Sequence, residues 1–202
     1  PFRNLLKKYY IFIDKFKTNK KFYFEKKNKN KSSYYLPVDF NNTDNLLFLD
    51  GNFESEKYFF EYRKELLNEF KFKNTLQFSK NNFLKIIKNS NVVSICVRQN
   101  RFSERLSNKN TSVSINKSNL FLQNTIDYIY RAKSFFEKKI DNPVFLVWSN
   151  DFTNLDNYLP KDKFIYVVNK ENKILSDFYL LTQCKYFIIA PSTFSWWGAW
   201  LS

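Results

Sequence analysis

The sequence predicts an α/β fold, a Rossmann-like parallel sheet with helices on both of its faces. From residue 91 onward, short runs of β-branched and aromatic residues alternate with longer helical segments, as expected of parallel strands joined by crossover helices. Hydrophobic residues make up 44% of the 202 residues, enough for a packed core, which excludes a disordered chain. The last apolar run leads through a polar turn into a helix, the unit that α/β proteins use to hold phosphate.

The first ninety residues alternate less regularly. Residues 1–33 are basic and aromatic, and the part from residue 20 resembles a surface strand running into a charged turn. Residues 46–50 predict a second strand, and Ser55 precedes a predicted helix that reaches about residue 72. The core-facing side of this helix would comprise Phe59, Tyr62, Leu66 and Phe70. Residues 81–90 fit either a short helix or an irregular connection.

The second part of the chain contains four predicted strands and three predicted helices. The strands are expected at residues 91–98, 144–148, 164–168 and 186–190. The helices are expected from Ser118, as N-cap, to about Lys139, then at residues 177–184 and 194–201. The polar run at 102–117 predicts a surface loop. The first of these helices would turn Leu120, Ile126, Ile129 and Phe136 to the core.

The turn before the last helix is the strongest candidate for a binding site. Pro191 ends the strand, and Ser192 and Thr193 are both suitable N-caps for the helix that follows. The first helical N–H groups have no acceptor inside the helix, and the macrodipole adds positive charge there. The hydroxyls of Ser192, Thr193 and Ser195 would complete a cradle for a diphosphate. An ordinary capped helix with core tryptophans is the alternative.

The composition limits the possible functions. The net charge of +14 would attract nucleic acid or an anionic membrane, but abundant Lys, Asn, Phe, Tyr and Ile, with 2 Gly and 5 Pro, are typical of an AT-rich coding sequence. No run of 18 apolar residues predicts a transmembrane helix. Cys96 and Cys184 read as free buried thiols in a reducing compartment. The absence of His excludes Ser–His and Cys–His catalysis and disfavours a zinc site.

Two segments resemble a known family. Residues 192–201 read STFSWWGAWL, which is similar to the signature near the C-terminal end of glycosyltransferase family 11, the bacterial α-1,2-fucosyltransferases. Residues 46–59 resemble a second segment of the same family. The resemblance implies a GT-B-type pair of Rossmann-like domains. Residues 1–90 would be the remnant of an incomplete acceptor-side domain with its connection, and 91–202 the nucleotide-sugar domain. The first residue is not Met and the chain stops just after the motif, so we expect a fragment.

The family's arginine motif is only partly present. Where the family has a strand ending in His-x-Arg-Arg-x-Asp, this chain reads CVRQNR from Cys96. Arg98 matches the first arginine, which the family uses against the donor diphosphate, and a guanidinium can fork two phosphate oxygens. Cys96, Gln99 and Arg101 replace the His, the second Arg and the Asp. The resemblance therefore implies retained donor binding with impaired turnover.

Three carboxylates complete the candidate site. Asp151 follows a strand in a turn that resembles the family's Ser-Asp-Asp, and would face the nucleotide or cap a following helix. Asp177 matches an acidic residue that related enzymes place against guanine; helix capping is its alternative. Glu104 would be the catalytic base or a solvated loop residue. The predicted donor-binding residues are Arg98, Asp151, Asp177, Ser192, Thr193, Phe194 and Ser195, and the predicted catalytic residues are Arg98 and Glu104.

The resemblance implies transfer of L-fucose from GDP-fucose to a galactoside hydroxyl in surface glycan synthesis. The α-1,2 linkage would form with inversion, without a metal or another cofactor. The protein would be cytoplasmic, with a peripheral contact on the inner membrane face. Two alternatives stand beside this function: an inactive or fragmentary homologue, and a basic nucleic-acid-binding module, for which no recognised motif is present. The acceptor glycan and the oligomeric state are not predicted.

Overall fold

The computed structural model describes residues 20–24, 35, 46–51, 53, 55–73, 75, 78–104, 111–168 and 174–202. The chain divides into two compact units, Pro1–Glu69 and Phe70–Ser202. Residues 1–19 and 25–33 lie outside the described residues, and with them the charged turn that was predicted after the first strand. The division of roles at residue 90 stays a prediction.

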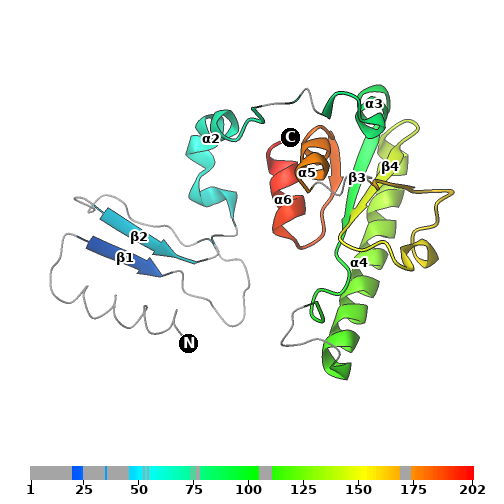
Figure 1. Ribbon diagram of the computed structural model, residues 1–202, viewed down its shortest axis with the longest axis horizontal. Coiled ribbons are helices and arrows are strands. Elements are labelled where there is room, and N and C mark those ends of the chain that lie inside the picture. Colours follow the sequence, from blue (N-terminus) through cyan, green and yellow to red (C-terminus); the bar gives the residue numbers. More distant parts are fainter. Residues whose placement is uncertain are drawn as a thin grey trace. The chain divides into compact units, whose positions relative to one another are not determined.

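The first unit contains a small parallel sheet. Strands β1 (Lys20–Phe24) and β2 (Leu46–Asp50) pair from Lys20 opposite Leu46 to Phe24 opposite Asp50 (Figure 1). Both strands were predicted, and both are confirmed. Phe53 and Tyr35 each pack edge-on against Tyr58, with ring centroids 5.0 and 4.9 Å away.

The single helix predicted after Ser55 is wrong. The chain instead forms two 3-10 turns, η1 (Glu56–Tyr58) and η2 (Phe60–Tyr62), followed by the short helix α2 (Arg63–Glu69). Phe59 adopts a φ of −143°, outside the helical range, and this ends the first turn. No residue of these three elements is buried, so the predicted apolar face does not pack into a core. Tyr62 remains 63% exposed.

The second unit is built on a four-stranded parallel sheet. Its strands are β3 (Val92–Val97), β4 (Val144–Ser149), β5 (Ile165–Tyr166) and β6 (Tyr186–Ile188). They lie in the order β5-β4-β3-β6, and every pairing is parallel. The predicted strands and the predicted parallel sheet are confirmed.

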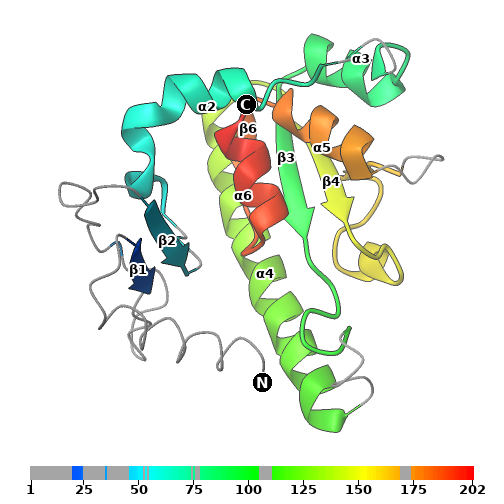
Figure 2. The same ribbon diagram turned by 60° about the vertical axis from the view of Figure 1, so that its left-hand side comes forward.

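Helices cover both faces of this sheet. They are α3 (Asn82–Asn89), α4 (Ser112–Lys139), α5 (Ile174–Thr182) and α6 (Thr193–Trp200), with a 3-10 turn η5 (Leu155–Asn157). Figure 2 shows α4 behind the sheet and α5 and α6 in front of it. The short-helix alternative for residues 81–90 is therefore the observed one, and Asn81 caps it by accepting from the N–H of Phe83.

Strand β3 explains why the sheet needs two layers of helices. All six of its residues are buried. Val93 and Ile95 belong to the core cluster that includes α4, whereas Val92 and Cys96 belong to the cluster that includes α3 and α5. Because successive strand residues point to opposite faces, an apolar run of this kind is stable only when both faces are covered.

Helix α4 begins earlier than its sequence suggests. Thr111, not Ser118, is the N-cap, and its hydroxyl accepts from the N–H of Ser114 at 3.2 Å. The predicted loop at 102–117 is accordingly shorter. Ser118 lies inside the helix, where its hydroxyl donates to the carbonyl of Ser114 at 2.9 Å. A Ser-rich run can satisfy its own hydroxyls along a helix, which makes it look like a loop in the sequence.

The inward face of α4 is also corrected at one position. Leu120 is 64% exposed, and Leu122 occupies the core in its place. Ile126 and Ile129 are buried as predicted, and Phe136 is partly buried against the same cluster. The earlier start of the helix does not change its period of 3.6 residues. The prediction that Leu120 belongs to the buried face was therefore wrong in itself.

The part of the chain that the structure describes contains no helix long and apolar enough to cross a membrane. Within the same residues, no group of three His, Cys, Asp or Glu side chains is placed to hold a metal ion.

Candidate functional site

The strand order defines where a ligand would bind. From β3 the chain moves to β4 and β5 on one side, and then returns to β6 on the other side of β3. In open parallel sheets, ligands bind outside the carboxyl ends of the strands where the strand order reverses. Here that point lies between β3 and β6. The segments that follow these two strands contain Arg98 and Ser192.

Arg98 directly follows β3, and its guanidinium is already paired. Its Nη2 atom donates to both carboxylate oxygens of Glu104, at 2.7 and 2.5 Å. The two side chains are 37% and 34% exposed, so the pair lies at the surface of the molecule. A guanidinium has five N–H donors in a planar fork, and this pair uses one nitrogen. Arg98 can therefore also meet an anion that approaches from solvent.

Gln99 connects the segment after β3 to the segment after β4 by hydrogen bonds. Its backbone N–H donates to Oδ1 of Asn150 at 2.9 Å, while Nδ2 of Asn150 donates back to the carbonyl of Gln99 at 3.2 Å. The Gln99 side chain, which is buried, donates to the carbonyls of Asp151 and Thr153. A buried amide with these partners fixes the backbone next to Arg98.

Asp151 takes part in the same network. Its carboxylate accepts from the backbone N–H of Thr153 at 2.9 Å and from Nδ2 of Asn100 at 3.1 Å. The bond from the Thr153 backbone is the main cause that lowers the pKa of Asp151 below its ordinary value. Asp151 caps no α-helix, because a 3-10 turn with Asn154 as its N-cap follows. The capping alternative is thus wrong, and the nucleotide contact stays a prediction.

Arg101 connects the segment after β3 with the turn after β6. Its Nη1 atom donates to the carbonyl oxygen of Pro191, 90 residues away in the sequence. The guanidinium also lies over the rings of Phe121 and Phe102, with 4.9 and 5.9 Å to their centroids. Arg98 precedes Arg101 by three residues and Ser192 follows Pro191, so this bond joins the two halves of the candidate site.

The turn after β6 is a capped helix start. Ser192 is the N-cap of α6, and Oγ of Ser192 accepts from the N–H of Ser195 at 3.2 Å. The N–H of Trp196 donates to the Ser192 carbonyl. The N–H groups of Thr193 and Phe194, the first two of the helix, have no intrahelical acceptor and offer donors to an anion. Thr193 is exposed, and its predicted contact with a diphosphate stays a prediction.

Ser195 and Phe194 lie on the inner side of this turn. Ser195 is 1% exposed, and its hydroxyl donates to the Ala190 carbonyl at 2.7 Å, so in this conformation it holds the turn rather than facing solvent. Phe194 is half-buried and packs against Phe178 of α5, with ring centroids 5.3 Å apart. Among the tryptophans of α6, Trp200 is buried, whereas Trp196 and Trp197 are half-buried. Capping and core packing thus coexist in this helix.

Asp177 lies in the first turn of α5 and is half-buried. Helix α5 follows β5, so its N-terminal turn is on the carboxyl side of the sheet, like the segments that hold Arg98 and Ser192. Parallel topology therefore gathers Arg98, Asp151, Asp177 and the Ser192 turn along one edge. This helix begins three residues earlier than predicted, which turns Asp177 from a cap into a first-turn residue.

The three residues that depart from the family motif have defined places. Cys96 is buried in β3, and burial raises the pKa of its thiol to about 12, with a smaller effect from Cys184. Gln99 is buried and connects the segments after β3 and β4, and Arg101 is bonded to the Pro191 carbonyl. Sequence reasoning missed both connecting roles. The sequence signal for these roles was an amide side chain and a cationic side chain shortly after a strand. In a parallel sheet, this is where loops from distant parts of the chain meet.

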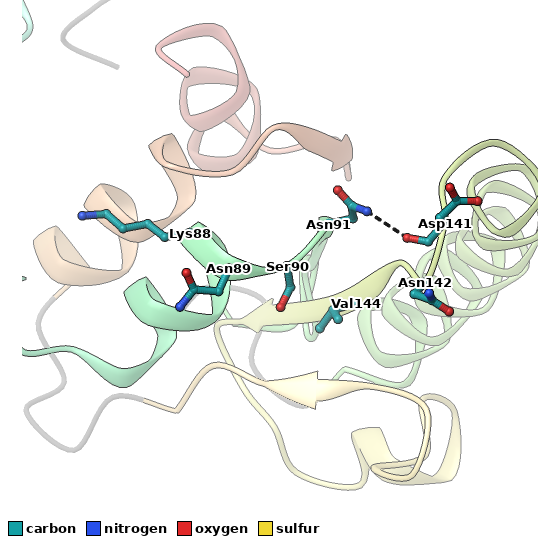
Figure 3. Close-up of a pocket in the computed structure, with 7 residues that line it drawn as sticks. All are labelled: Lys88, Asn89, Ser90, Asn91, Asp141, Asn142 and Val144. Carbon is teal, nitrogen blue, oxygen red and sulfur yellow. Dashed lines mark hydrogen bonds between the residues drawn. The ribbon is translucent and has the colours of Figure 1, made fainter.

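A separate hollow of about 560 Å³ lies at the opposite edge of the sheet. It is lined by Lys88, Asn89, Ser90, Asn91, Asp141, Asn142 and Val144 (Figure 3). These residues precede β3 and β4, except Val144, which is the first residue of β4, so the hollow is at the amino edge. Figure 3 shows the bond from Nδ2 of Asn91 to the Asp141 carbonyl, 2.8 Å long, that joins its two sides. Ligand binding in parallel sheets favours the other edge.

A parallel sheet covered on both faces, with cationic and N–H donors at its switch point, belongs to the Rossmann-like class of nucleotide-binding units. Within that class, the chain belongs to glycosyl transferase family 11, whose model matches residues 3–202. The resemblance inferred from the tryptophan motif is confirmed, and with it the GT-B-type fold class and the assignment to glycosyltransferases.

Two curated relatives, both from Escherichia coli, are glycosyltransferases by name. The O-antigen biosynthesis glycosyltransferase WbnK is 38% identical over 79 residues, which cover 38% of this chain and 26% of the relative. An alpha-1,2-colitosyltransferase is 27% identical over 156 residues, covering 75% of this chain and 50% of the relative. The chain thus spans half or less of the length of each. No solved structure matches the chain.

Proposed function

We propose that this chain forms the donor-binding part of a galactoside α-1,2-fucosyltransferase that transfers L-fucose from GDP-fucose with inversion. The family membership supports a nucleotide-sugar donor and a glycan acceptor. The choice of fucose and of a galactoside comes from the family resemblance of the tryptophan motif. One relative is named for colitose rather than fucose, so the sugar varies among similar proteins while the α-1,2 linkage is retained in that name.

The observation that carries the proposal is the bond from Arg101 to the Pro191 carbonyl. It holds the segment with Arg98 against the turn with Ser192, and both lie at the switch point of the sheet. In the proposed complex, Arg98 forks the diphosphate and the N–H groups of Thr193 and Phe194 donate to its oxygens. Together they stabilise the negative charge that develops on the departing GDP.

The roles of the three carboxylates follow from the chemical groups that each of them can bond. Asp177 accepts from guanine N1–H and the exocyclic amine, a pair of donors that adenine lacks. Asp151 lies beside the nucleotide at the same edge, and Glu104 takes the proton of the acceptor hydroxyl. No metal enters the proposed mechanism, because cationic and N–H groups neutralise the diphosphate instead. The reaction would take place at the cytoplasmic face of a membrane, where the positive charge of the chain favours a peripheral contact.

Calorimetric titration of the chain with GDP tests the donor site. We expect GDP to bind and ADP to bind less tightly, since only guanine matches Asp177. Arg98→Ala should weaken GDP binding about tenfold to a hundredfold, the loss expected for charge-assisted hydrogen bonds. Arg131→Ala, on an exposed position of α4, removes the same charge without touching the site and serves as control. Unchanged GDP affinity in Arg98→Ala would disprove this assignment of the site.

The sugar and the acceptor require the complete enzyme. GDP-fucose and the colitose donor should be compared with a panel of galactosides, and the linkage of the product determined by NMR. Transfer of fucose to the 2-hydroxyl supports the proposal; transfer of another sugar corrects the donor but not the site. If GDP does not bind at all, the inactive homologue becomes the better description of this chain.

A further inference from the structure

The carboxylate of Glu104 occupies Nη2 of Arg98, one of the guanidinium nitrogens that a phosphate would use. Both of its oxygens accept from Nη2 of Arg98, at 2.7 and 2.5 Å. Carboxylate and phosphate oxygens seek the same guanidinium donors. Both ways in which a guanidinium can fork two oxygens, through Nη1 and Nη2 or through Nε and Nη2, use Nη2. A diphosphate that binds Arg98 in a fork must therefore share Nη2 with Glu104 or displace it.

The backbone holds Glu104 in this place. The N–H groups of Ser103 and Glu104 both donate to the carbonyl of Asn100, at 3.1 and 2.9 Å, and close a tight turn after Arg98. The N–H of Phe102 donates to Oγ of Ser118 at 3.0 Å and anchors the turn on α4. The turn therefore directs the carboxylate at the guanidinium, six residues along the chain, instead of leaving it free in solvent.

The Arg98–Glu104 ion pair is weak enough to be replaced by a contact between Arg98 and a diphosphate. Each side chain is about one-third exposed, and ion pairs of that exposure contribute little to stability because water screens them. A diphosphate carries more negative charge than one carboxylate and also meets the N–H groups at the start of α6. Binding of the diphosphate to Arg98 therefore releases more free energy than breaking the Arg98–Glu104 pair costs.

We propose that Glu104 is an exchangeable occupant of the donor site: it orients Arg98 when the site is empty and yields the guanidinium to the diphosphate when the donor binds. This inference rests on the proposed function, since it assumes that Arg98 binds the donor diphosphate. Glu104 then sets the donor affinity by competition. Its carboxylate becomes available to an acceptor hydroxyl only after a donor has arrived.

The test is GDP binding by Glu104→Gln in the full chain, measured by calorimetry. Gln has the same shape as Glu but no charge, so the competitor is weakened while the turn is kept. We expect GDP to bind about two- to fivefold more tightly, the fold-change that corresponds to losing an exposed ion pair. Glu104→Asp keeps the charge and should stay close to the affinity of the unchanged chain. Equal or weaker GDP binding by Glu104→Gln overturns the inference.

A double-mutant cycle separates competition from a general effect of charge. In an Arg98→Gln background, Glu104→Gln should leave GDP affinity unchanged, because no shared guanidinium remains. Glu137→Gln is the matched control, since Glu137 pairs with Lys133 near the far end of α4. If it tightens GDP binding as much as Glu104→Gln does, long-range charge explains the gain and the exchange is disproved.

Inorganic pyrophosphate, used as a second probe, distinguishes this inference from the proposed function. If the unchanged chain binds pyrophosphate but not GDP, the guanosine assignment fails while the exchange at Arg98 can still be measured. If it binds both and Glu104→Gln changes neither affinity, the exchange fails and the donor site stands. If it binds neither, the donor site fails and the exchange fails with it.

Discussion

Arg101 shows how one side chain can assemble a site from distant segments. It stands where the family has an acidic residue, yet its bond to the Pro191 carbonyl and its position over the Phe121 ring give it a structural task. A cation over an aromatic face and a charge-assisted bond are each modest at a half-exposed position. Their value here is positional, because they join the segments that carry Arg98 and Ser192.

We therefore predict that Arg101→Gln weakens GDP binding about fivefold, with a loss of roughly 1 kcal/mol in the free energy of unfolding. The reason is that the two segments are no longer held together, although Arg98 itself is intact. Calorimetry and urea unfolding measure the two effects. Arg131→Gln, which removes the same charge from an exposed position of α4, should change neither quantity. Equal effects in both variants would contradict a positioning role.

The two cysteines are core residues and not nucleophiles. Both belong to the cluster beneath α3 and α5, and burial raises the pKa of each thiol to about 12. Both thiols are therefore neutral at physiological pH. Since thiolates are the reactive form, neither cysteine has the low pKa and exposure of a catalytic cysteine.

This predicts that a maleimide at about pH 8 labels neither thiol in the folded chain and labels both after unfolding. The sign of the pH effect follows from the raised pKa. The folded state binds the thiol protons more tightly, so their contribution to stability is complete below the unfolded pKa of about 9. It is lost as the pH rises toward 12. Rapid labelling of the folded chain would show that these thiols are accessible.

At the scale of elements, the packing of α5 against α6 depends on Gly198. A Cβ atom at this position would lie 2.3 Å from Cδ2 and 2.7 Å from Cγ of Leu181. Leu181 is completely buried, so it has little room to move away. The glycine therefore permits the close approach of α6, the helix whose first turn contributes to the candidate site.

We predict that Gly198→Ala lowers the free energy of unfolding by about 1–3 kcal/mol, as overpacking of a core does. Urea unfolding measures this loss. Leu181→Ala is destabilising by itself, but in its background Gly198→Ala should cost much less, because the methyl group then fills the space that is left. A cost that is the same in both backgrounds would mean that contact with Leu181 is not its cause.

At the scale of the whole molecule, the net charge of +14 leaves a nucleic-acid-binding function as a rival. A positive field attracts any polyanion, and that attraction decreases steeply with salt because counterions are released along the nucleic acid. A structured site for one diphosphate behaves differently. It depends on a few fixed donors, so its salt dependence is shallow.

We therefore predict that binding of a single-stranded RNA of arbitrary sequence is lost by about 0.15 M salt, whereas GDP binding persists. Fluorescence anisotropy for the RNA and calorimetry for GDP give the two salt dependences. The matched comparison is the same pair of titrations on Arg98→Ala, which should lose GDP binding and keep its weak attraction for RNA. Tight RNA binding at that salt concentration, without any heat from GDP, would favour the nucleic-acid function.

Elements that depend on local pattern were readable from the sequence. The apolar runs of β3, β4 and β6 predict buried strands because β-branched and aromatic residues gather in each short run and suit both faces of a covered sheet. The start of α6 was readable to within one residue, since Ser192 and Thr193 were both suitable N-caps; the structure uses Ser192, and the helix spans Thr193–Trp200 instead of the predicted 194–201. Family membership came from the tryptophan motif that follows.

Contacts between distant residues were decided only by the tertiary structure. Gln99 meets Asn150 across 51 positions and Arg101 meets Pro191 across 90, because parallel strands bring their carboxyl ends to one edge. The pairing of Arg98 with Glu104 has a different cause, since it forms within a local turn closed by hydrogen bonds to the Asn100 carbonyl, and the sequence shows this turn only as a polar loop. Amphipathic period alone could not place Leu120 outside the core, since the inner side of a helix is chosen by what packs against it.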